Sequence, residues 1–141
     1  MIKTTELRIG NYVQLNNKPE EKGLTRIIAH LYKDSVALLN MQGISGHFAE
    51  DVDPILITEQ RLFLFKFKKV NEFSGIGYKL GNFLLSFVTS IKGESSCYEC
   101  EWIPNKYPFE KRSDVKSGIL YVHELQNLYF ALTGEELNQV K

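Results

Sequence analysis

The stretch from residue 121 to residue 137, YVHELQNLYFALTGEEL, constrains the fold more than any other part of the chain. Its apolar residues recur at spacings of three and four: Val122, Leu125, Tyr129 and Leu132. This period predicts an amphipathic helix over residues 120–133, packed along one face. Gly134 follows at the point where a residue in the left-handed conformation commonly ends a helix.

The same helix begins with the first half of a zinc-protease motif. His123 and Glu124 start the pattern His-Glu-x-x-His, which places two imidazoles four residues apart so that both face one metal. The position four residues after His123, where the second histidine belongs, holds Asn127 instead. We therefore interpret His123 and Glu124 as polar positions flanking the apolar stripe. We predict no metal site, no cofactor and no catalytic residue, and an enzyme is the least favoured of three hypotheses.

Residues 1–57 predict a small barrel-like β unit. The β-rich runs RIGNYVQL, LTRIIAHLY and SVALLNMQ are separated by polar or turn residues, with Lys33-Asp34 as a tight turn. The glycine-containing run GISGH, residues 43–47, is predicted as a further turn. RIGNYV, followed by a loop and a second strand, is similar to the openings of small SH3-like barrels, which implies a curled antiparallel sheet.

Residues 58–141 predict an α+β unit that forms one compact domain with the first. Thr58 is suited to cap a short helix that ends near Lys66. A second antiparallel β meander follows, in which Gly81-Asn82 predicts a type II′ turn because glycine comes first. Residues 103–118 contain two prolines and are predicted as a long loop. The C-terminal helix is expected to pack across this meander, so the fold class is α+β.

The pair Cys97 and Cys100 spells C-x-x-C within the run SCYECEWI. That run alternates as a strand does, so the two thiols are expected on opposite faces, with Cys100 inward beside Trp102. A structural zinc site needs a second such pair or paired histidines, and a redox pair belongs at a helix start. Two cysteines in 141 residues fit a reducing compartment rather than a disulfide scaffold.

Charge and hydropathy limit the partners of the chain. Seventeen basic residues balance seventeen acidic ones, so no net field draws the whole protein toward nucleic acid or anionic lipid. The longest apolar runs are far shorter than the roughly 20 residues of a membrane span. The first residues lack the apolar run of a signal peptide. We predict a cytoplasmic protein that does not bind membranes.

One segment nevertheless concentrates basic residues: Arg61, Lys66, Lys68, Lys69 and Lys79. Aromatic residues are interleaved with them: Phe65, Phe67, Phe73 and Tyr78. Basic side chains with aromatics can hold single-stranded nucleic acid through phosphate contacts and base stacking. The alternative is that the aromatics are core and the basic residues form a solvated face. A nucleic-acid-binding module is therefore the second hypothesis.

The favoured hypothesis is a non-catalytic protein that acts through a protein partner. The long loop carries two aromatic residues, Tyr107 and Phe109, beside Lys111 and Arg112, and an exposed apolar patch there would form a partner-binding site.

Three parts of the sequence resemble a family of small uncharacterised proteins encoded by Bacteroidota genomes and their phages. They are ELRIGNYV near the start, DPILITEQRL in the middle and YVHELQNLYFALTGEEL near the end. The segment between residues 71 and 118 departs from the resemblance. What the resemblance implies is a phage, prophage or mobile-element accessory protein that works in the cytoplasm of a bacterial host cell and whose partner is an unknown host or phage protein. It carries no catalytic residues over to this chain.

Overall fold

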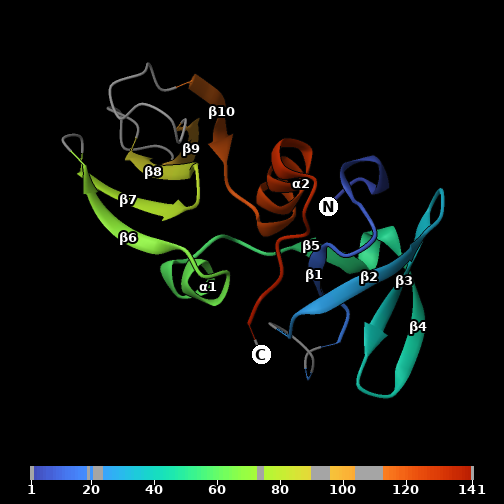
Figure 1. Cartoon of the computed structure of the whole chain (residues 1–141). Coiled ribbons are helices and arrows are strands. Elements are labelled where there is room, and N and C mark those ends of the chain that lie inside the picture. The colour runs from blue at the N-terminus through green and yellow to red at the C-terminus, as the bar shows by residue number, and fades with distance from the viewer. Residues whose placement is uncertain are drawn as a thin grey trace. The chain divides into compact units, whose positions relative to one another are not determined.

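The computed structural model shows an α+β fold, as predicted, with two five-stranded antiparallel sheets (Figure 1). The structure describes residues 2–18, 20, 24–72, 75–89, 96–103 and 113–140. The chain forms two compact units. The first unit contains Met1–Leu56 and Tyr121–Leu137, and the second contains Ile57–Leu120 and Asn138–Lys141. No helix in the described ranges is long and apolar enough to cross a membrane.

The first unit contains a five-stranded sheet in which the strands that come first and last in the sequence are neighbours. Its strands are β1 (Tyr12–Leu15), β2 (Arg26–Leu31), β3 (Ser35–Asn40), β4 (Gly43–Phe48) and β5 (Val52–Pro54). Two 3-10 turns, η1 (Thr4–Glu6) and η3 (Ala49–Asp51), precede β1 and β5. The strand order is β4-β3-β2-β1-β5, so β1 pairs with both β2 and β5. The predicted β unit in the first third of the chain is therefore present.

Strand β4 corrects one prediction, because the run GISGH was expected to be a turn. Its backbone instead pairs with β3 at six successive positions, from Asn40 opposite Gly43 to Ser35 opposite Phe48. The turn lies earlier, at Met41 and Gln42. Glycine lowers intrinsic strand propensity, but pairing with a neighbouring strand outweighs that local preference here.

The core of the first unit comes from the alternation of its strands. The buried cluster consists of Ile2, Leu7, Val13, Leu15, Ile28, Val36, Leu38 and Val52. Alternate strand residues point to the same face of a sheet, so Val36 and Leu38 of β3 face this cluster together. Side chains at the positions between them point to the opposite face.

Helix α2 (Val122–Thr133) confirms the predicted C-terminal helix, and Gly134 ends it with a φ of 73°. It belongs to the first unit, rather than lying with the meander of residues 58–120. Its buried residues are Val122, His123, Leu125 and Gln126. His123 was interpreted as a flanking polar position, which is wrong: the side chain is buried and its ring stacks on Tyr121, 5.8 Å between centroids.

Hydrogen bonds from one buried amide attach α2 to the start of β1. The Oε1 atom of Gln126 accepts from the backbone N–H of Tyr12 at 2.8 Å. Its Nε2 atom donates to the carbonyls of Gly10 at 3.2 Å and Leu137 at 3.1 Å. Asn127 adds a second attachment, since its Nδ2 atom donates to the Glu6 carbonyl at 2.8 Å. The helix is thereby held by polar contacts as well as by its apolar residues.

The second unit pairs a short helix with a meander. Its elements are α1 (Glu59–Leu64), β6 (Lys68–Glu72), β7 (Gly75–Leu80), β8 (Phe83–Thr89), β9 (Ser96–Trp102) and β10 (Ser113–Ile119), with strand order β10-β9-β8-β7-β6. Thr58 caps α1, because its Oγ1 atom accepts from the Arg61 N–H at 3.3 Å. Gly81 has a φ of 58° and Asn82 does not have a positive φ, which matches the predicted type II′ turn.

Strand β10 corrects the prediction that residues 103–118 form one long loop. Residues 113–119 pair with β9, from Ser113 opposite Trp102 to Ile119 opposite Tyr98. Two register shifts interrupt this ladder. The strand carries mostly polar residues, so it has no apolar alternation from which the sequence could reveal it. Residues 104–112 lie outside the described ranges.

We predict that Gln126→Ala lowers the free energy of unfolding by about 2–4 kcal/mol, because it leaves buried backbone groups at Tyr12 and Leu137 without their partner. Urea unfolding followed by circular dichroism measures the change. The matched control is Gln42→Ala in the exposed turn before β4, which should change stability by less than about 0.5 kcal/mol. Equal effects of the two substitutions would show that the buried amide does not hold the helix.

Candidate functional site

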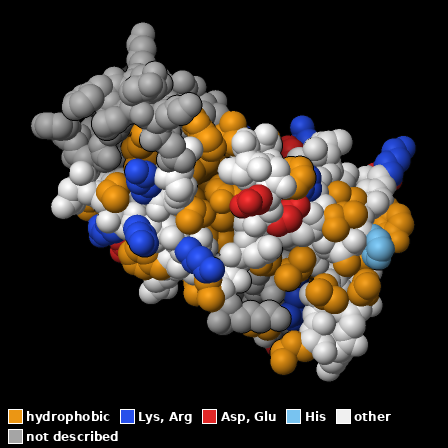
Figure 2. Space-filling model, in the orientation of Figure 1, with side chains coloured by type: hydrophobic (Ala, Val, Ile, Leu, Met, Phe, Trp, Pro, Cys, Tyr) orange, Lys and Arg blue, Asp and Glu red, His pale blue; other side chains and the backbone are white. Residues whose placement is uncertain are grey.

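The basic segment predicted to bind nucleic acid lies in the second unit, and the structure brings together only part of it. Lys68 of β6 and Lys79 of β7 stand directly opposite each other, and both are exposed. Figure 2 shows Lys and Arg side chains gathered over β6 and β7. Lys66 is exposed just before β6, in a turn where its φ is 68°. Like charges at opposite positions repel, so this pair would be stabilised by an anion.

The other two basic residues are engaged differently. The Nζ atom of Lys69 lies 2.6 Å from Oε1 of Glu59, and the hydroxyl of Tyr78 donates to the same oxygen at 2.8 Å. These two hydrogen bonds, that from Lys69 first, lower the pKa of the Glu59 carboxyl. Arg61 is partly buried, and burial lowers the pKa of its guanidinium. Lys69 is thus already paired with a carboxylate and Arg61 is partly buried, so neither is as available for a phosphate contact as Lys68.

The interleaved aromatics are core residues. Phe65, Phe67 and Tyr78 are buried, and the Phe67 ring packs edge-on against Phe83 with 6.2 Å between centroids. Burial, together with the Glu59 carboxylate, raises the pKa of Tyr78 to about 12. Phe73 lies outside the described residues. Base stacking on the three buried rings is excluded, and the structural interpretation of these three rings is confirmed.

The partner-binding site predicted at Tyr107, Phe109, Lys111 and Arg112 falls wholly outside the described residues.

Cys97 and Cys100 lie on β9, where they face opposite sides of the sheet. Cys97 pairs with Val88 and Cys100 with Leu85. Cys100 is buried, as predicted, and this burial raises the pKa of its thiol to about 12. Over the described part of the chain, no group of three or more His, Cys, Asp or Glu side chains could hold a metal ion.

This geometry predicts that only one of the two thiols reacts in the folded protein. At pH 8 the Cys97→Ser variant should resist a soluble disulfide reagent until it is unfolded, because Cys100 is buried and protonated. The Cys100→Ala variant retains the partly exposed Cys97 and should react without denaturant. Absorbance of the released thiol measures both rates. Rapid reaction of the Cys97→Ser variant would contradict the inward placement of Cys100.

The most exposed apolar group in the first unit was not predicted. It consists of Leu39, Met41, Ile44 and Phe48, whose exposed fractions are 45%, 102%, 58% and 66%, and we call it the β3–β4 surface. Leu39 and Ile44 are opposite each other on the two strands, and Met41 lies in the turn that joins them. Figure 2 shows hydrophobic side chains over this part of the first unit. The sequence signal was the alternation of Ile44 and Phe48 with Ser45 and His47, which the two glycines concealed.

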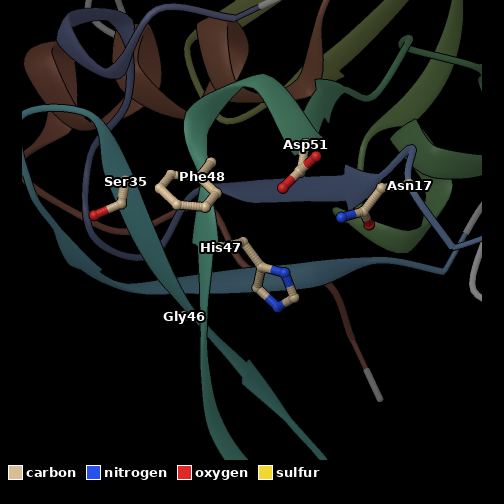
Figure 3. Close-up of a pocket in the computed structure, with 6 residues that line it drawn as sticks. All are labelled: Asn17, Ser35, Gly46, His47, Phe48 and Asp51. Carbon is tan, nitrogen blue, oxygen red and sulfur yellow. The ribbon is translucent and has the colours of Figure 1, made fainter.

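Two hollows are lined in part by Phe48. One, of about 400 Å³, is lined by Asn17, Ser35, Gly46, His47, Phe48 and Asp51 (Figure 3). In Figure 3 the side chains of His47 and Phe48 leave β4 on opposite sides, and Asp51 and Asn17 lie on the side of His47. The Nε2 atom of His47 is 2.9 Å from Oγ of Ser45. A second hollow, of about 490 Å³, also reaches Phe48 and is lined in part by Thr4 and Lys33.

Comparison with known proteins adds no assignment. No protein-family model matches the chain, and no curated protein or solved structure does so.

Proposed function

We propose that the chain is a non-catalytic protein-interaction module and that the β3–β4 surface binds another protein. The observation that carries this proposal is that exposed Leu39 and Ile44 stand opposite each other on β3 and β4, with Met41 in the turn between the strands and Phe48 on the same face of β4 as Ile44. An isolated exposed leucine is ordinary, whereas a contiguous apolar patch marks an interaction site on many soluble proteins.

The energetics agree with this role. Fully burying a leucine, isoleucine, methionine or phenylalanine side chain is worth about 1.5–3 kcal/mol. Three of the four residues of the β3–β4 surface are about half exposed or more, and Met41 is fully exposed. A partner that covers them gains the part of this free energy that corresponds to their exposed fraction. The hollows lined in part by Phe48 add concave surface into which a partner's side chains could fit.

The cellular role that we propose follows from the sequence resemblance: an accessory protein of a phage, prophage or other mobile element, acting on a host or phage protein inside the bacterial cell. We further propose that the first unit is an SH3-like barrel. Two features support this: β1 lies between β2 and β5, and the 3-10 turn η3 sits between β4 and β5.

Nucleic-acid binding is the second candidate, and the opposite placement of Lys68 and Lys79 favours it. Two exposed ammonium groups on neighbouring strands could contact adjacent phosphates, and each contact would release counterions and make binding salt-sensitive. It ranks second because Lys69 is paired with Glu59, and Phe65, Phe67 and Tyr78 are buried.

The double substitution Leu39→Ser with Met41→Ser tests the proposed surface, because it removes apolar area without changing the edge strand β4. We expect the tagged variant to lose protein partners that the wild type retains from a nuclease-treated lysate of a bacterial or phage-infected host. Mass spectrometry with isotope labels compares the two. The matched control, Ile76→Ser with Phe87→Ser, removes exposed apolar side chains from the second unit and should retain those partners.

Identical partner lists for wild type and the Leu39→Ser, Met41→Ser variant would reject the β3–β4 surface as the binding site. Nucleic acid recovered only without nuclease, and lost in a Lys68→Glu, Lys79→Glu variant, would favour the second candidate instead.

A further inference from the structure

Among the described residues the two sheets end in four edge strands, β4, β5, β6 and β10, and three of these carry features that oppose pairing with another chain. Strand β5 has three residues and ends in Pro54. Strand β6 has the sequence KKVNE, with three charged residues, and β10 has two register shifts and two charged residues. Short length, proline, charge and irregular register are the devices by which proteins prevent edge-to-edge association.

Strand β4 has none of these features. Its sequence GISGHF contains no Lys, Arg, Asp, Glu or Pro, and its six pairs with β3 show no register shift. Every residue of β4 is exposed or half-exposed. It is therefore the edge of this molecule best suited to accept a further strand, and added strands are a common mode of protein recognition.

We propose that β4 pairs antiparallel with β4 of a second copy of this chain, with Gly46 on the two-fold axis. This inference deepens the proposed function, on which it rests, by naming the chain itself as a partner. The pairing joins two sheets of the first unit edge to edge, and a two-fold interface uses the same strand from both copies.

The side chains of β4 select this register. With Gly46 opposite Gly46, each Ile44 faces a Phe48 of the other copy, and each Ser45 faces a His47. Ile44 and Phe48 share one face of the strand, so apolar side chains meet apolar ones on that face and polar meet polar on the other. No like charges meet, because β4 contains no Lys, Arg, Asp or Glu.

The neighbouring registers fit less well. In an antiparallel pair, two opposite residues either both point their backbone N–H and C=O groups toward the other strand or both point them away. The alternative registers closest to this one therefore have the two-fold axis at Ser45 or at His47. An axis at Ser45 places Ile44 opposite Gly46, and an axis at His47 places Phe48 opposite Gly46 and brings two histidines together. Either choice removes the contacts between the exposed apolar side chains.

Gly46 offers a direct test of the axis. A Cβ atom added to Gly46 would meet nothing within 4 Å in its own chain, and its φ is not in the left-handed region. Opposite residues in an antiparallel pair have Cα atoms about 4.5–5.5 Å apart, which is within the range that a disulfide spans. The experiment is Gly46→Cys in a Cys97→Ser background, oxidised in the full-length protein and run on a non-reducing gel.

We expect Gly46→Cys to give a disulfide-linked dimer. His47→Cys in the same background is the matched control and should give none with itself, since its partner position is Ser45. A mixture of His47→Cys and Ser45→Cys chains should link only as the mixed pair, which tests the register without touching Gly46. Wild type should show a concentration-dependent shift from monomer to dimer in sedimentation velocity.

Three outcomes would each overturn the proposal. The first is equal cross-linking of Gly46→Cys and His47→Cys, and the second is no cross-linking of Gly46→Cys or of the mixed pair. The third is a wild type that stays monomeric at high concentration. These outcomes differ from failure of the proposed function. If the Leu39→Ser, Met41→Ser variant loses its partners and Gly46→Cys forms no dimer, the β3–β4 surface is supported as a binding site and self-pairing is rejected. A Gly46→Cys dimer with unchanged partners would support self-pairing and reject the surface as a site for other proteins.

Discussion

The buried amide of Gln126 is the contact on which the first unit depends. Apolar packing alone would allow α2 to rotate or slide over the sheet, because one methyl group can replace another. A fully buried amide that bonds Tyr12, Gly10 and Leu137 at once permits one position only. Residues at the two ends of the sequence thereby form one body, in which β1 is held between β2, β5 and the C-terminal helix.

This arrangement separates the supported side of the sheet from its accessible side. Strand β1 is held by α2, whereas β4 lies three strands away at the end of the order β4-β3-β2-β1-β5. Strand β4 combines exposed apolar side chains with an edge that lacks charge and proline. In the second unit the edges carry charge or irregular register, and Lys69 of the basic segment is paired with Glu59.

Local chemistry made part of this fold predictable from sequence. The helix period from Val122, the cap at Thr58 and the turn at Gly81 depend on residues a few positions apart, and all three are present. The buried positions of His123 and Gln126 could not be predicted, since the partners of Gln126 include Gly10, more than a hundred residues away. Strand β4 was missed because its pairing with β3, rather than its glycine-rich composition, decides its conformation.

Hydrogen–deuterium exchange of the wild-type protein at low and high concentration tests the central claim most directly, since it reports on backbone pairing without substitution. Pairing of β4 with a second copy predicts that those amides of Gly43–Phe48 that point away from β3 gain protection as concentration rises, while the amides of β6 and β10 do not. Unchanged exchange in Gly43–Phe48, or a gain confined to β6 or β10, would contradict the assignment of β4 as the pairing edge.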